Sequence, residues 1–335
     1  MASADDTYEY PMYDVALAFG DSITQLGYEH KNSGWLTHLS NKYVRRMDIL
    51  NRGFSGYNTT RARQVAHVVF PTRRDDSRQS ELAKGSSSSF SSGMFGWLSK
   101  GTNGIKEILL GRRALNKSSW PSADATFPRL YPRVKLCILF FGANDAADPK
   151  DSRHTPLKEY PENLRYIVNM LRSPESPHYS PDTRILIVTP PAVGDKMSEE
   201  WFKHRGWRYG PQKNAVTKMY AEAAVKVAED MGLPYVDMWT AVEQRVQESR
   251  LLNLILPSTE NATVDATSIL ADTNYNVPKT TAKPQGSLKQ TEPNSEYDGY
   301  DEFLTDGLHL NSNGNELLSR LVSSAINRNW PELRP

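Results

Sequence analysis

The sequence predicts one domain of the α/β class, with three layers: a mostly parallel sheet of about five strands between two layers of helices. Short apolar runs alternate along the chain with longer segments of helical period, which is the order of β-α-β units. The runs are almost continuously apolar, as expected of strands that are buried on both faces. A chain of 335 residues is long enough for one such domain with insertions.

The individual elements are predicted from these two patterns. The five strands are expected at residues 15–19, 47–50, 134–141, 184–189 and 235–237. Helices are indicated where apolar residues recur three and four positions apart. They are expected at residues 34–46, 157–171, 211–231, 240–250 and 311–329.

Two stretches interrupt this alternation, and we interpret them as insertions into a single domain of residues 1–335. Residues 74–128 include a serine-rich segment, and residues 257–300 are rich in Thr, Asn, Ser and Pro without a clear period. From Arg73 to Arg133 the chain carries eleven basic and five acidic residues beside apolar ones. This composition suits a flap that covers a substrate pocket and makes peripheral contact with anionic lipid. The alternative is a solvated loop that packs on the core through its few apolar residues.

Charge and cysteine content narrow the functional classes. Lys and Arg number 40 and Asp and Glu 39, so the net charge of +1 indicates no nucleic-acid partner. The single cysteine, Cys137, excludes a disulfide within the chain and a multi-cysteine metal site. We therefore expect a reducing, cytoplasmic location. No apolar run approaches the roughly 18 residues of a spanning helix, and the first residues do not resemble a signal peptide. The oligomeric state stays open.

A serine follows the first predicted strand, in the turn Gly20-Asp21-Ser22. Open parallel sheets place their sites at the carboxyl ends of the strands. The Ser22 hydroxyl could therefore act as a nucleophile, and its backbone N–H could bind an oxyanion. The alternative is that Asp21 or Ser22 only caps the following helix.

An acid and a histidine lie three residues apart just before the last predicted helix. In this segment Asp306 can accept a hydrogen bond from Nδ1–H of His309, which leaves Nε2 free to take a proton from Ser22. A serine hydroxyl needs such a base to become a good nucleophile. An ordinary surface pair is the alternative.

Two further residues follow predicted strands and could supply oxyanion donors. Gly53 comes after the second strand and could bring a backbone N–H close to a substrate, and Asn144 comes after the third and carries a side-chain amide. A simple turn glycine and an Asx turn are the alternatives.

In their order along the chain, four short segments resemble the sequence motifs of the GDSL or SGNH superfamily of serine hydrolases: Gly20-Asp-Ser22, Gly53, Gly142-x-Asn144 and Asp306-x-x-His309. The wording of residues 48–57, 142–146 and 305–310 further resembles its isoamyl acetate-hydrolysing esterase branch. The resemblance covers residues 13–72, 132–250 and 302–330. It implies a flavodoxin-like α/β/α fold and an enzyme that hydrolyses short-chain, acetate-type esters without a cofactor. It implies these roles: Ser22 as nucleophile, His309 as base, Asp306 as its orienting partner, and the Ser22 N–H, Gly53 N–H and Asn144 side chain as the oxyanion hole.

Several alternatives remain at this point. The substrate could instead be an acetylated sugar or a lipid-type ester, or the fold could serve as a binding module without turnover. A Gly-x-Ser-x-Gly elbow and nucleotide-binding glycine motifs are absent. Asp145 and Asp148 lack a partner set typical of magnesium, so no metal is expected. Tyr57 and Phe141 are predicted to line the site, with packing in the core as the alternative.

Overall fold

The structure, a computed structural model, describes residues 13–72, 133–205, 210–255 and 297–335. Residues 13–71 and 133–335 belong to one compact unit. A second unit, residues 1–12 and 72–132, lies outside the described residues apart from Thr72. The predicted insertion 74–128 and all but the last residues of 257–300 also lie outside them, so the single-domain interpretation and the flap stay predictions.

A parallel five-stranded sheet forms the centre of the described unit. Its strands are β1 (Asp14–Gly20), β2 (Met47–Gly53), β3 (Val134–Phe140), β4 (Arg184–Val188) and β5 (Tyr235–Val236). They lie in the order β2-β1-β3-β4-β5, and every neighbouring pair is parallel. This is the order of flavodoxin-like folds, and the predicted fold class is confirmed.

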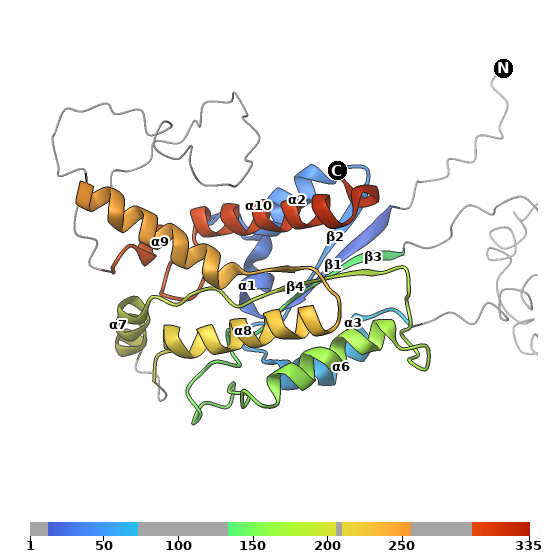
Figure 1. Ribbon diagram of the computed structural model, residues 1–335, viewed down its shortest axis with the longest axis horizontal. Helices are drawn as coiled ribbons and strands as arrows, with labels where there is room; N and C mark the ends of the chain where they lie inside the picture. Colours follow the sequence, from blue (N-terminus) through green and yellow to red (C-terminus); the bar gives the residue numbers. More distant parts are fainter. Residues whose placement is uncertain (1–12, 73–132, 206–209, 256–296) are drawn as a thin grey trace, which may run out of the picture. The chain divides into compact units, whose positions relative to one another are not determined.

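Helices cover both faces of the sheet, as Figure 1 shows. One face carries α2 (Trp35–Lys42), α9 (Met238–Ile255) and α10 (Ser312–Asn329). The other carries α3 (Thr59–Val69), α6 (Tyr160–Arg172) and α8 (Asn214–Asp230). The other helices in the described residues are α1 (Ser22–Gln25), η1 (Leu26–Tyr28), α7 (Asp195–Arg205), η4 (Tyr300–Glu302) and η5 (Pro331–Leu333).

Alternation along the strands explains the continuous apolar runs. In β1, Ala16 and Ala18 pack toward the α2 and α10 side, whereas Leu17 and Phe19 pack toward the α3 and α6 side. Both pairs are at most 2% exposed. Because each face of the strand is covered by helices, no position is left for a polar residue, and burial of each large side chain stabilises the fold by about 1.5–3 kcal/mol.

Two of the longer helices in the described unit, α3 and α7, were not predicted from the sequence. The buried positions of α3 include two small alanines, Ala62 and Ala66, and α7 buries only Met197 and Ser198. Such weak apolar stripes give little periodic signal. The start of α3 is nevertheless well defined, because the Asn58 side chain caps it by accepting a hydrogen bond from Arg61 N at 2.9 Å.

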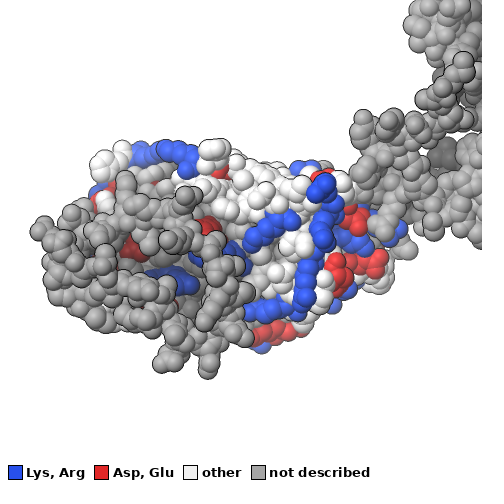
Figure 2. Space-filling view, turned by 90° about the horizontal axis from the view of Figure 1, so that it is seen from above, with Lys and Arg blue, Asp and Glu red and all other residues white. Residues whose placement is uncertain are grey.

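The charged surface of the described unit carries both signs. Seen from above, Lys and Arg side chains lie among uncharged residues with Asp and Glu side chains close by (Figure 2). Arg184 and Glu332, for example, form a half-exposed ion pair at 3.0 Å. Within the described ranges, none of the helices has both the length and the apolar character needed to cross a membrane.

Candidate active site

The order of the strands places the topological switch point of the sheet beside β1. The chain leaves β1 for β2 on one side and later returns to β3 on the other side. The carboxyl ends of β1 and β3 therefore flank the topological switch point, where open α/β sheets bind ligands. Ser22 follows β1, and Asn144 follows β3. In the register of the sheet Gly20 pairs with both Gly53 and Phe140, so the three strands end level with one another.

The structure brings the serine, the histidine and the acid together. Nε2 of His309 lies 2.9 Å from Oγ of Ser22, although 287 positions separate the two residues. Nδ1 of His309 lies 2.7 Å from Oδ2 of Asp306. A carboxylate can only accept hydrogen bonds, so Nδ1 carries the proton and Nε2 is left to accept the serine hydroxyl. The arrangement is that of a base ready to deprotonate a nucleophile.

The loop before α10 holds Asp306 in place. Its Oδ1 accepts hydrogen bonds from the backbone N–H groups of Leu308 at 3.1 Å and His309 at 2.8 Å. An antiparallel bridge between Leu304 and Leu310 closes the base of the loop. One carboxylate oxygen thus fixes the loop, and the other fixes the imidazole.

The electrostatics of this pair favour a charged state. Burial raises the pKa of Asp306, but its hydrogen bond to His309, the histidine charge and the two backbone N–H groups outweigh burial and hold the pKa below its ordinary value. Burial likewise lowers the pKa of His309, but the hydrogen bond and charge of Asp306 outweigh it, with a further contribution from Asp21. The charge of Arg153 acts in the opposite direction. The net result is a His309 pKa above its ordinary value, which makes it a stronger base.

The serine turn contains a helix cap and, next to it, a serine in contact with His309. Oδ1 of Asp21 accepts a hydrogen bond from Ile23 N at 2.9 Å and so caps α1, while Ser22 meets His309. Asp21 is only 1% exposed, and burial raises its pKa to about 7. Ser22 itself is 7% exposed at the first position of α1.

Gly53 is explained by packing. A Cβ atom at this position would lie 2.0 Å from the backbone nitrogen of Gln25, so only glycine lets the end of β2 approach α1. Its N–H donates to Oδ1 of Asn51 at 2.8 Å and is therefore occupied. Three residues later, Gly56 has a φ of +76°, and no acceptor for its N–H occurs among the described residues.

Asn144 is buried, 3% exposed, and its side chain reaches the loop after β2. Nδ2 donates to the carbonyl oxygen of Tyr57 at 3.0 Å. Because a side-chain amide has two N–H groups, the second remains for another acceptor. This contact also brings the Gly56–Tyr57 backbone close to Asn144.

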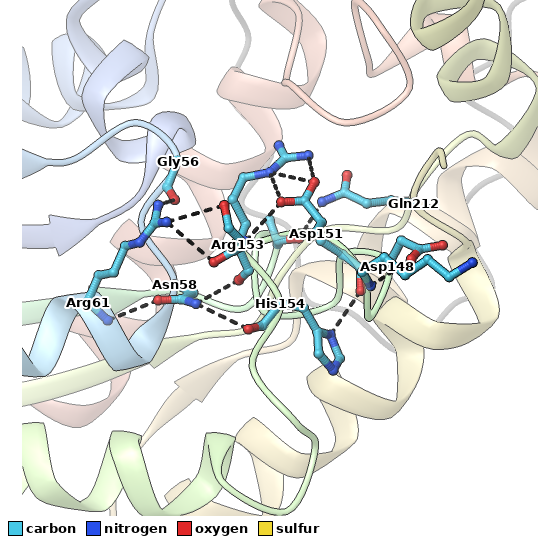
Figure 3. A network of polar contacts seen from close by, with 12 residues as sticks. Gly56, Asn58, Arg61, Asp148, Asp151, Arg153, His154 and Gln212 are labelled. Atoms are coloured by element: carbon cyan, nitrogen blue, oxygen red, sulfur yellow. Dashed lines mark hydrogen bonds and ion pairs between the residues drawn. The ribbon is translucent and has the colours of Figure 1, made fainter. Parts of the chain in front are cut away.

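A polar network fixes the loop that follows Asn144 (Figure 3). From the start of α3, Asn58 donates to the carbonyl oxygens of Arg153 at 2.7 Å and His154 at 3.4 Å. Arg61 donates to the carbonyl oxygen of Gly56 at 3.2 Å. Within the loop, Nε of Arg153 lies 3.0–3.1 Å from both carboxylate oxygens of Asp151. The network therefore joins the loops that follow β2 and β3.

These network residues were not predicted from the sequence. Asn58 and Arg61 lie more than 90 positions from their partners in the loop, and nothing in their local pattern indicates the contact. The charge of Arg153 reaches His309, which the sequence also did not indicate. The Asx cap at Asn58 was the single local signal available.

The aromatic residues near the crevice divide into two groups. Phe141 is 1% exposed and its ring centroid lies 4.9 Å from that of Phe19, so its side chain belongs to the core. Trp35 is fully buried, and its Nε1 donates to the carbonyl oxygen of Ile23. Tyr57 is half-buried against Phe54, with 5.0 Å between ring centroids. Tyr28 is 40% exposed.

The acids considered as metal ligands have other partners. Asp145 accepts hydrogen bonds from the backbone and hydroxyl of Thr59, and Asp148 accepts one from Lys150 N at 2.8 Å. Over the described part of the chain, no group of three or more His, Cys, Asp or Glu side chains is placed to hold a metal ion.

Comparison with known proteins identifies the family. The family model for the GDSL-like lipase/acylhydrolases matches residues 17–322. An isoamyl acetate-hydrolyzing esterase 1 homolog of Mus musculus is 30% identical over 239 residues, 71% of each chain. A GDSL esterase/lipase of Arabidopsis thaliana is 27% identical over 233 residues, 68% of this chain and 70% of that one. A lipase/acylhydrolase structure from Enterococcus faecalis aligns with a TM-score of 0.45 and 17% identity, covering 94% of this chain and 96% of that one.

The fold and the site bring together a serine, a histidine and an acid in the arrangement that serine hydrolases use. The chain belongs to the GDSL-like lipase/acylhydrolase family. It is a carboxylic ester hydrolase that acts on small-molecule esters.

Proposed function

We propose that the protein is a serine esterase that hydrolyses short-chain, acetate-type esters through an acyl-enzyme on Ser22. The observation that carries the chemistry is the hydrogen-bonded chain from Ser22 Oγ to His309 and on to Asp306, at 2.9 and 2.7 Å. The similarity to relatives named isoamyl acetate-hydrolyzing esterase 1 homolog supports the small acyl group.

In the first half of the reaction, Nε2 of His309 takes the hydroxyl proton as Ser22 Oγ attacks the ester carbonyl. The tetrahedral intermediate then collapses, and His309 gives this proton to the leaving alcohol. In the second half, water attacks the acyl-enzyme and His309 repeats the same two transfers. Asp306 keeps Nδ1 protonated throughout and stabilises the imidazolium.

Three donors are proposed for the oxyanion. The Ser22 N–H lies at the start of α1, and the second N–H of Asn144 is not used by Tyr57. For the third donor we assign Gly56 N–H in place of Gly53 N–H, because the latter is occupied by Asn51. Preorganised donors of this kind stabilise the charge that develops on the carbonyl oxygen.

The remaining expectations belong to this proposal. Tyr57, half-buried beside Asn144, lines the pocket, and no cofactor takes part. A cytoplasmic location, and membrane contact through residues 74–128, remain predictions; that segment lies outside the described residues.

A panel of nitrophenyl esters tests the proposal. Acyl chains from two to sixteen carbons are compared with and without a serine-trapping phosphonate. We expect the highest kcat/KM for the shortest chains, complete inhibition by the phosphonate, and the phosphonyl adduct on Ser22 by mass spectrometry. An optimum at long chains would contradict the acetate-type assignment, and labelling of another residue would contradict the nucleophile.

A further inference from the structure

Two buried acids lie next to active-site residues in the chain and have no role in the mechanism above. Asp21 precedes the nucleophile Ser22, and Asp145 follows the oxyanion donor Asn144. They are 1% and 0% exposed. In each of them Oδ2 has no hydrogen-bond partner among the described residues. A buried oxygen without a partner is costly, so both groups call for a physical explanation.

The two acids differ in how well their charged forms are supported. Oδ1 of Asp145 accepts two hydrogen bonds from Thr59, one from the backbone N–H at 2.9 Å and one from the hydroxyl at 2.5 Å. Oδ1 of Asp21 accepts only one, from Ile23 N. Burial raises the pKa of both, to about 6 for Asp145 and about 7 for Asp21. The charged form of Asp21 therefore has less support, and the negative charge of Asp145 raises the pKa of Asp21 further.

The groups that face these acids come from several elements. Toward Asp21 lie His309 from the loop before α10, Asp145 from the loop after β3 and Tyr160 from α6. Tyr160 stays protonated, because burial holds its pKa well above the ordinary value and its hydroxyl donates to the carbonyl oxygen of Phe141 at 3.0 Å.

His309 has its own set of neighbours. Asp306 and Asp21 favour its charged form, and Arg153 opposes it. Asp306 contacts the imidazole directly, and Asp21 directly precedes Ser22, whose Oγ lies 2.9 Å from Nε2. Two carboxyl groups from opposite ends of the chain therefore act on His309, and the mechanism uses only one of them.

We propose that the Asp21 carboxylate is a second counter-ion for the His309 imidazolium. Asp21 is a positioning residue: it neither gives nor takes a proton in the reaction. Its charge stabilises the imidazolium that forms when Ser22 attacks the substrate. This inference rests on the proposed function of Ser22 and His309.

The test compares isosteric variants, and its first readout needs no substrate. Asp21→Asn removes the charge but keeps a capping oxygen, since Asn also caps helices well. The titration of the His309 imidazole is followed by NMR in the wild type and the variant. We expect the His309 pKa to fall by about one unit in Asp21→Asn, a tenfold change in proton affinity. The acid limb of kcat/KM should move by the same amount, and kcat above pH 8 should fall roughly three- to tenfold.

Asp145→Asn is the matched control, because it removes a buried charge of the same kind beside the other active-site residue. It relieves the repulsion on Asp21, so Asp21 ionises more easily and His309 keeps its counter-ion. We expect the His309 pKa to stay or rise in this variant. If Asp21→Asn does not fold, Asp21→Ser also keeps a capping oxygen and serves in its place.

The outcomes separate this inference from the proposed function. An unchanged His309 pKa in Asp21→Asn, or an equal fall in Asp145→Asn, would show that Asp21 only caps α1 and would overturn the inference. Absence of phosphonate labelling at Ser22 would overturn the proposed function, while the NMR titration would still decide the role of Asp21.

Discussion

The loop before α10 and the turn after β1 each hold an aspartate close to the same histidine, and the two regions treat it differently. Asp306 accepts hydrogen bonds from two backbone N–H groups and from the imidazole. Asp21 is more deeply buried and accepts one. The pKa of Asp306 consequently lies below its ordinary value, whereas that of Asp21 rises to about 7. Direct contact with His309 and two backbone hydrogen bonds outweigh burial at Asp306, whereas at Asp21 burial dominates over a single hydrogen bond and the charge of His309.

The largest effect is expected from removing the two groups that both regions serve, the serine and the histidine. Ser22→Ala and His309→Ala should each lower kcat by about 10⁴-fold or more, because nucleophile and base act as one unit. The double variant should be no worse than either single one. Steady-state kinetics with the best nitrophenyl ester, together with a thermal melt to confirm folding, provide the check. Substantial turnover by a folded Ser22→Ala would refute the assignment.

Neutralising Asp306 tests the difference between the two acids most directly. In Asp306→Asn the amide can donate to Nδ1, so His309 adopts the tautomer that carries its proton on Nε2 and can no longer accept from Ser22. We expect a loss in kcat of about 10³–10⁴-fold, far beyond that of Asp21→Asn. Parallel kinetics of the two variants measure the difference. Losses of equal size would mean that the two acids share one role.

A smaller effect is expected at the oxyanion. Asn144→Ala should lower kcat by about 10²–10³-fold with little change in KM, because its free N–H acts only on the charge of the transition state. A boronate inhibitor should bind more weakly by a similar factor. If only KM changes, Asn144 binds the substrate and does not stabilise the oxyanion.

The smallest expected effect concerns stability, and it has opposite signs at the two acids. The pKa of Asp21 rises on folding from 3.8 to about 7, so its ionisation costs native stability progressively between about pH 4 and pH 7. Asp21→Asn removes this cost. The free energy of unfolding of the variant, relative to wild type, should therefore increase by about 2 kcal/mol from pH 5 to pH 8. Urea unfolding at the two pH values measures the gain.

The stability of Asp306→Asn relative to wild type should change in the other direction. The pKa of His309 is raised on folding, so its contribution is fully present below its ordinary pKa and is lost as pH rises through the folded value. Because Asp306 is the main cause of that rise, its removal should destabilise the protein more at pH 5 than at pH 8. Equal pH dependence in the two variants would contradict the contrast between the two regions.

Local patterns in the sequence were sufficient for the strands and for most of the helices. The strand 134–141 and the helix 311–329 were predicted within a residue or two of β3 and α10, because buried apolar runs and periodic stripes are properties of neighbouring residues. The weak stripes of α3 and α7 gave no such signal. The nucleophile, the base and its acid were also chosen from short motifs, at Ser22 and at Asp306-x-x-His309.

By itself, then, the sequence determined the α/β order of the chain, the family and the chemical type of each candidate catalytic group. The tertiary structure decided how these groups are used, because that depends on burial and on contacts between distant residues. It placed His309 against Ser22 and occupied the Gly53 N–H with Asn51. It also buried Asp21 with a single hydrogen bond, whereas Asp306 accepts hydrogen bonds from two backbone N–H groups and from the imidazole. Residue type fixes the protons and charges that a group can carry, but only the folded environment sets their energies.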